Sequence, residues 1–154
     1  MKRILIASAL TLSLISTGTF ADDIYYSGEA ISVGNPGDPG KVSRTIEITM
    51  VDNRFRPSEI SVEKGETIKF ILKNTGKKKH EMVIGTPEEL NKHAKMLKRF
   101  PDMEQPNKPN MVAVNPGKTG ELIWHFTETG EVNFACPMPG HSKNMYGTID
   151  VKTK

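Results

Sequence analysis

The sequence is poor in the residue types on which many protein functions depend. Among its 154 residues it has a single cysteine, Cys136, and four histidines. A lone cysteine has no intramolecular disulfide partner. The sequence also lacks a Ser/His/Asp set, a phosphate-binding glycine loop and a paired-carboxylate motif. We therefore expect no catalytic activity of its own and no catalytic residues.

Long apolar runs are lacking too, except at the N-terminus. Residues 4–15 are apolar, follow Lys2 and Arg3, and precede the small-x-small sequence Thr19-Phe20-Ala21. This order is typical of a cleaved secretory signal. A membrane anchor is the alternative, but the apolar stretch is too short to span a bilayer. We therefore predict a signal peptide over residues 1–21, a mature protein in the periplasm and no membrane insertion after cleavage.

An excess of charge of one sign is also missing. The chain has 21 basic and 18 acidic residues, and the predicted signal contains two of the basic ones, Lys2 and Arg3. The mature chain would therefore be close to neutral. Such a balance gives no reason to expect binding to nucleic acid or to a membrane surface.

What the sequence does contain is an alternating pattern of apolar and polar residues. Residues 22–44 are rich in glycine and proline and are expected to be extended, with an edge strand around residues 30–33. From residue 45 onward, apolar side chains recur at every second position, as at Ile46, Ile48 and Met50. About seven such short segments, separated by turn residues, predict an all-β antiparallel sandwich or barrel over residues 45–154.

One segment departs from this pattern and predicts a helix. Thr86 supplies a capping hydroxyl, Pro87 follows it, and the next two residues are acidic. These residues favour the start of a helix. Apolar residues then recur at helical spacing from Leu90 to Leu97. We expect a short helical insertion at about residues 86–110, between two strands.

The chemistry of the chain is concentrated after the strand that ends at Cys136. Pro137, Pro139 and Gly140 force a stiff turn there, which can bring His141 back beside the sulfur. Met145 follows one turn later on the same loop, and His80 can reach the loop only from a neighbouring strand end. A thiolate with two imidazoles and a more distant thioether suits a redox-active copper ion. We therefore predict a metal site made of four residues, His80, Cys136, His141 and Met145.

Other interpretations of these residues exist. A cysteine on a buried strand is often only a small apolar side chain, and an odd cysteine outside the cytoplasm can pair with a second chain. Zinc also binds cysteine and histidine, but it gains little from a thioether. The combination of a thiolate, two imidazoles and a thioether favours copper over these alternatives.

Four segments give the chain a resemblance to a known family. They are residues 60–70 (ISVEKGETIKF), 74–80 (NTG and His80), 126–130 (FTETG) and 136–147 (CPMPGH and MYG). Together they resemble the cupredoxins, or type 1 copper proteins, over residues 45–151. The spacing of the C-terminal ligand loop and the position of the helical insertion are similar to those of azurin, whereas the loop of plastocyanin is shorter.

The resemblance implies a Greek-key β-sandwich that holds one type 1 copper ion, which cycles between Cu(I) and Cu(II). It assigns His80, Cys136 and His141 as trigonal ligands and Met145 as the weak axial ligand. Within the family the chain looks most like the periplasmic cupredoxins of copper tolerance. It departs from the electron carriers at Glu81, where they usually have asparagine. Strand alternation predicts that Glu81 points away from the ligand side.

Several other residues could approach a copper ion. Met82 and Met138 lie near the predicted ligands, but packing in the core or at its rim is the favoured interpretation. His93 and Met96 can share one helix face. Together with Met103 and Met111, which are nearby in sequence, they could form a second, weak Cu(I) site. The alternative is that Met96 packs beneath the insertion while His93 is exposed.

Two functions are compatible with these predictions. Enzymes with several copper sites need more histidines than this chain has. The chain is therefore interpreted as a copper-binding protein that handles copper and confers tolerance, or as an azurin-like carrier of single electrons between respiratory partners. A redox or copper-transfer protein is a candidate partner. Glu81 and the methionines of the insertion favour copper handling.

Overall fold

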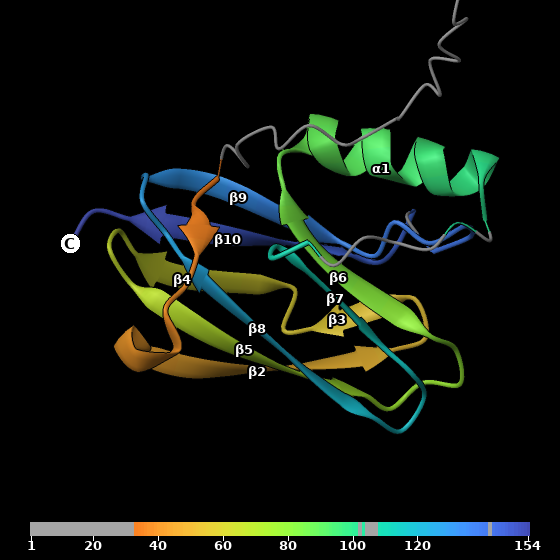
Figure 1. Ribbon diagram of the computed structural model, residues 1–154, viewed down its shortest axis with the longest axis horizontal. Helices are drawn as coiled ribbons and strands as arrows, with labels where there is room; N and C mark the ends of the chain where they lie inside the picture. Colours follow the sequence, from red (N-terminus) through yellow and green to blue (C-terminus); the bar gives the residue numbers. More distant parts are fainter. Residues whose placement is uncertain (1–32, 102, 104–107, 142) are drawn as a thin grey trace, which may run out of the picture.

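The chain folds into two β-sheets packed face to face, with one helix on the outside (Figure 1). The computed structural model describes residues 33–101, 103, 108–141 and 143–154. The predicted signal peptide, residues 22–32 and part of the loop after the helix lie outside the described residues. Within the described part, no helix is long and apolar enough to cross a membrane.

Each sheet has five strands. Sheet I has the order β1-β8-β5-β2-β3, and sheet II has the order β4-β10-β9-β6-β7. The strands are β1 (Asn35–Pro36), β2 (Arg44–Val51), β3 (Arg54–Arg56), β4 (Glu59–Glu63), β5 (Thr67–Asn74), β6 (His80–Gly85), β7 (Met111–Val114), β8 (Thr119–His125), β9 (Gly130–Ala135) and β10 (Tyr146–Lys152). Strand β2 pairs with β5, and β10 with β4, in parallel, and the other pairs are antiparallel. The predicted sandwich is confirmed, but the expectation that it is antiparallel throughout is wrong, because the chain crosses between the two sheets before it forms these two parallel pairs.

The apolar alternation in the sequence becomes the core between the two sheets. In β4, for example, Ile60 and Val62 are buried while the three residues around them are exposed. The largest core side chains are aromatic, and Phe55 of sheet I meets Phe134 of sheet II edge to face at 5.1 Å between ring centroids. One buried face per strand is what a sandwich requires.

Strands β1 and β3 were not predicted from the sequence, because two or three residues are too few to show an alternating pattern. Strand β1 pairs with β8 at Asn35 and Pro36. The edge strand expected around residues 30–33 lies, except for Val33, outside the described residues. Strand β3 pairs with β2 across a tight turn in which Asn53 has a φ of 65°. A short 3-10 turn, η1 (Pro39–Lys41), precedes β2.

Helix α1 (Pro87–Arg99) lies across the outer face of sheet II, over β6 and β9 (Figure 1). The predicted helix between two strands is thus confirmed. Its start has the expected cap, because the Thr86 hydroxyl accepts a hydrogen bond from Glu89 N–H and the Glu89 carboxylate accepts one from Thr86 N–H. Leu90 packs with Val83, Ala135 and Met111 in a small second core beneath the helix. As a result every residue of β6 is buried, on both faces of the strand.

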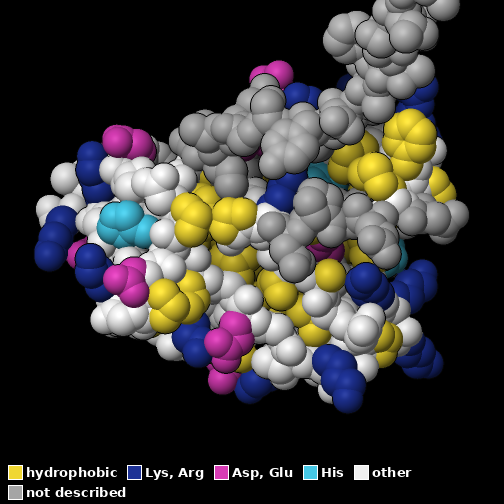
Figure 2. Space-filling view, viewed as in Figure 1, with side chains coloured by type: hydrophobic (Ala, Val, Ile, Leu, Met, Phe, Trp, Pro, Cys, Tyr) yellow, Lys and Arg dark blue, Asp and Glu magenta, His cyan; other side chains and the backbone are white. Residues whose placement is uncertain are grey.

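On the face drawn in Figure 2, Lys and Arg side chains occur at both ends, whereas Asp and Glu side chains lie mainly at the left and in the centre.

Candidate metal centre

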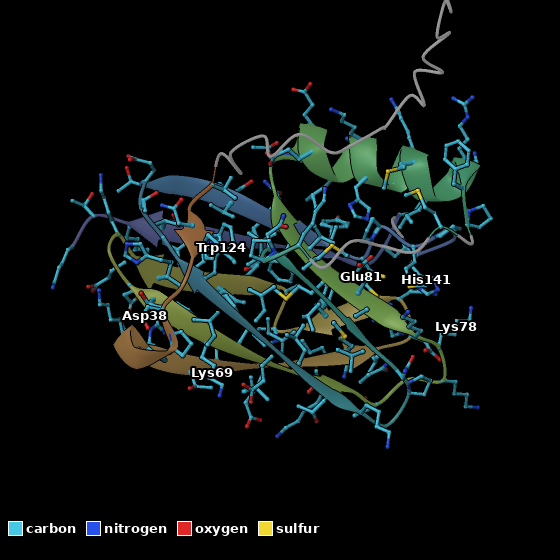
Figure 3. All side chains as sticks on the ribbon, in the orientation of Figure 1. Asp38, Lys69, Lys78, Glu81, Trp124 and His141 are labelled. Atoms are coloured by element: carbon cyan, nitrogen blue, oxygen red, sulfur yellow. The ribbon has the colours of Figure 1, made fainter. Side chains whose placement is uncertain are left out.

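Three of the four predicted ligands meet at one end of the sandwich. His80 begins β6, Cys136 directly follows β9, and His141 lies in the loop between β9 and β10. A ring nitrogen of each histidine and the Cys136 sulfur all lie within 4.8 Å of one another, and all three residues are buried. Among the described residues this is the only cluster of three His, Cys, Asp or Glu side chains with such geometry. Figure 3 shows His141 at the end of the molecule opposite Asp38.

The loop after Cys136 is folded back on itself by backbone hydrogen bonds. Cys136 N–H donates to Met145 C=O at 2.9 Å, and Met145 N–H donates to His141 C=O at 3.1 Å. His141 N–H in turn donates to Met138 C=O at 3.0 Å. Gly140 permits the reversal because its φ is +83°, a region that favours glycine. The predicted return of His141 to the sulfur is therefore present, with 3.5 Å between Cys136 Sγ and His141 Nδ1.

The fourth predicted ligand, Met145, lies on the same loop. Its backbone is hydrogen-bonded to both Cys136 and His141. Its side chain is fully buried in the core cluster that also contains Cys136. Met82 belongs to that cluster as well, and Met138 packs against it. These two methionines therefore pack in the core and at its rim.

The electrostatics of the three clustered residues favour a bound cation. Burial raises the pKa of the Cys136 thiol to about 11, even though Glu81 N–H donates a hydrogen bond to the sulfur at 3.4 Å. A thiolate at this position therefore needs a positive partner close by, such as a metal ion. Burial and the neighbouring His80 lower the pKa of His141. A neutral imidazole keeps a lone pair available for a metal.

The hydrogen bonds of His80 also suit it to bind a metal ion. Its Nε2 lies 3.1 Å from the carboxylate of Asp52, in the turn between β2 and β3. Its Nδ1 is buried and has no hydrogen-bond partner in the part of the chain that the structure describes. A buried nitrogen of this kind is costly unless something binds it. The residues present thus fit a thiophilic metal ion held by one sulfur and two nitrogens.

Glu81 is the feature that sequence reasoning described least well. Strand alternation turns its side chain away from the ligand side, but that side is covered by α1, and Glu81 is only 3% exposed. Burial raises the pKa of the Glu81 carboxyl to about 7, and the positive charge of Lys79 makes this rise smaller. Its carboxylate lies 4.0 Å from Nε2 of His93 on the helix. His93 is itself buried, so the alternative that it is merely exposed is wrong.

The second Cu(I) site suggested for the insertion stays a prediction. His93 is directed toward Glu81, whereas Met96 and Met111 are half-buried and Met103 is 39% exposed.

The comparison with known families decides what kind of domain this is. The model of the cupredoxin-like domain family matches residues 31–151. The chain belongs to the cupredoxin-like domain family. The resemblance expected from the four motifs is therefore confirmed, and the match extends further toward the N-terminus than the motifs did.

Relatives of this cupredoxin include proteins of copper resistance. The chain is 41% identical over 121 residues to the copper-resistant cuproprotein CopI of Rubrivivax gelatinosus, covering 77% of this chain and 73% of that protein. It is 33% identical over 183 aligned positions to the copper-resistant cuproprotein CopI of Pseudomonas aeruginosa, covering 98% of each. Among solved structures, the cupredoxin is similar to auracyanin A, a "blue" copper protein of Chloroflexus aurantiacus. That match has a TM-score of 0.59 and 25% identity over 70% of this chain and 98% of auracyanin A.

One residue beside the candidate metal centre of this cupredoxin, Asp52, was missed by sequence reasoning. Asp52 contacts His80 from 28 residues earlier in the chain. No motif marks Asp52, because a single aspartate in a turn is common. Only the register between β2 and β5 brings that turn to the start of β6.

Proposed function

We propose that this cupredoxin binds one copper ion through His80, Cys136 and His141, with Met145 as a weak axial ligand, and that it acts in copper handling and tolerance. The observation that carries the proposal is the buried sulfur with two ring nitrogens within 4.8 Å. The similarity to two copper-resistant cuproproteins supports the cellular role. Secretion to the periplasm, through the signal predicted at residues 1–21, would place the protein where copper enters the cell.

A bound copper ion would supply one-electron chemistry between Cu(I) and Cu(II). The protein's own contribution is to hold the ligands in one arrangement. A soft sulfur suits Cu(I), and imidazole nitrogens also suit Cu(II). Backbone hydrogen bonds hold the ligand loop at both the N–H and the C=O of His141. The same residues can therefore bind Cu(I) and Cu(II) with little rearrangement. We propose binding and redox cycling without a catalytic reaction on a further substrate.

Visible absorption and copper titration test the binding site. We expect the copper-loaded protein to show an intense thiolate-to-copper charge-transfer band, and Cys136→Ser to lose that band and most of its Cu(II) affinity. His125→Ala is a matched control, since His125 lies on β8 and contacts Thr67 rather than the cluster. A colourless cupric form of the unmodified protein would contradict the proposed coordination.

The second candidate function is that of an azurin-like single-electron carrier. The fold similarity to a blue copper protein favours it. Deleting the gene separates the two roles. Copper sensitivity with normal respiration is expected for copper handling, whereas a respiratory defect without copper sensitivity would favour the carrier.

A further inference from the structure

Asp52 lies in the β2–β3 turn and contacts the loop that leads into His80. One oxygen of its carboxylate, Oδ1, lies within hydrogen-bond distance of three donors. They are the backbone N–H of Lys77 at 2.9 Å, the backbone N–H of Lys78 at 3.3 Å and Nε2 of His80 at 3.1 Å. The side chain of Asp52 is 37% exposed, whereas that of His80 is fully buried. A single carboxylate oxygen therefore links the loop backbone to the imidazole.

The loop is shaped to approach this carboxylate closely. A Cβ atom at Gly76 would overlap Asp52 Oδ1, so that only glycine allows the loop to come this near. Asn74 holds the other side of the loop, since its side-chain N–H groups donate to Lys78 C=O and to Val114 C=O, each at 2.8 Å. The approach of Asp52 to His80 is thus built into the loop and does not depend on a freely rotating surface side chain.

The contact with Asp52 determines which nitrogen of His80 carries the proton. A carboxylate oxygen can only accept a hydrogen bond, so Nε2 of a neutral His80 must be the protonated nitrogen. The lone pair is then on Nδ1, the atom that is buried and has no hydrogen-bond partner in the described part of the chain. Carboxylates that orient a metal-binding histidine in this way fix both its ring and its tautomer.

We propose that Asp52 is a positioning residue of the metal centre, which holds His80 in the Nε2–H tautomer and aims its Nδ1 lone pair at the site shared with Cys136 and His141. The proposal rests on the proposed copper-binding function for its purpose. The hydrogen bond and the tautomer themselves belong to the metal-free protein. They can be tested there, whatever metal is bound.

The first measurement is the ¹⁵N chemical shifts of the His80 ring in the metal-free protein, read from long-range ¹H–¹⁵N correlations. We expect the Nε2–H tautomer in the unmodified protein and a loss of that preference in Asp52→Ala. Asp52→Asn should keep it. The amide oxygen can replace Oδ1, and the N–H groups of Lys77 and Lys78 hold that oxygen in place.

The second measurement is copper affinity with the visible spectrum of the loaded protein. We expect Asp52→Ala to bind copper about 10- to 100-fold more weakly and to shift the absorption band, as for loss of an outer hydrogen bond to a ligand histidine. Asp52→Asn should remain close to the unmodified protein. Asp38→Ala is the matched control, because Asp38 also accepts a backbone hydrogen bond, from Gly40, but lies at the opposite end of the molecule (Figure 3).

Three results would overturn the proposal. One is a proton on Nδ1 of His80 in the unmodified metal-free protein, which decides the matter even if Asp52→Ala does not fold. Another is a folded Asp52→Ala protein with unchanged tautomer and affinity. The third is an Asp52→Asn protein that is as impaired as Asp52→Ala. If the unmodified protein failed to bind copper, the proposed function would fail, while the tautomer result would still test Asp52.

Discussion

At the scale of single residues, Gly147 shows how closely the strands of sheet II are packed. It lies on β10 opposite Phe134 of β9. A Cβ atom at this position would overlap both the Phe134 ring and the backbone oxygen of Ser58. Phe134 is fully buried and also meets Phe55 across the core, so its ring cannot move aside freely. The site loop begins two residues after Phe134, which makes this contact relevant to the metal centre.

We therefore predict that Gly147→Ala lowers the free energy of unfolding by about 1–3 kcal/mol, the usual cost of overpacking a core. Urea or thermal denaturation of the metal-free protein measures the effect. Gly40→Ala is the control, because a Cβ atom there would lie 3.4 Å from Asp38 Oδ1, which is ordinary contact. Equal stability of the two variants would contradict the packing argument.

At the scale of secondary-structure elements, the covering of β6 by α1 decides the environment of the site. Strand β6 carries His80 at its start and is buried on both faces. The face away from the core is covered by the helix, which brings His93 near Glu81. The helix in turn begins with a reciprocal cap between Thr86 and Glu89, directly after the end of β6.

Removing that cap should weaken the helix. Thr86→Ala removes the hydroxyl that accepts the Glu89 N–H, and we expect a loss of about 0.5–2 kcal/mol in the free energy of unfolding. Denaturant titration followed by circular dichroism is the measurement. Thr153→Ala, at an exposed position after β10, should have little effect. A Thr86→Ala protein as stable as Thr153→Ala would show that the cap does not limit stability.

At the scale of the whole molecule, Arg44 connects the two sheets at the end distant from the metal centre. It lies at the start of β2 in sheet I and donates to Ser61 C=O of β4 in sheet II at 2.7 Å. The same guanidinium forms two hydrogen bonds to the Glu66 carboxylate, at 2.9 and 3.0 Å. A paired guanidinium and carboxylate of this geometry is stronger than a single surface contact.

This pair predicts a dependence of stability on pH. The Arg44 hydrogen bonds hold the pKa of Glu66 below its ordinary value of 4.5. A carboxylate with a lowered pKa stabilises the folded state above its unfolded pKa, and this contribution is lost as the pH falls through its folded pKa. The stability difference between the unmodified protein and Glu66→Gln should therefore be largest near neutral pH and should vanish in acid.

Chemical denaturation at neutral and at acidic pH measures this difference. Glu128→Gln is the control, because Glu128 is 74% exposed where it meets Lys64, and exposed ion pairs contribute little. A constant difference between the unmodified protein and Glu66→Gln across the pH range would contradict the role given to Arg44.

The sequence by itself determined the elements that depend on local chemistry. Alternation of apolar residues predicted the strands of a sandwich, because one face of each strand must be buried. The cap at Thr86 predicted the helix. The stiff sequence between Cys136 and His141 predicted a loop that returns to the sulfur, because prolines and a glycine restrict the backbone there.

The tertiary structure alone decided the contacts between segments that are distant in the chain. Burial of Glu81 and His93 follows from the placement of α1 over β6, which strand periodicity cannot reveal. The contact of Asp52 with His80 follows from the pairing of β2 with β5, which fixes where the β2–β3 turn lies. A sequence pattern records the neighbours within one element, whereas these contacts depend on how the sheets pair and pack.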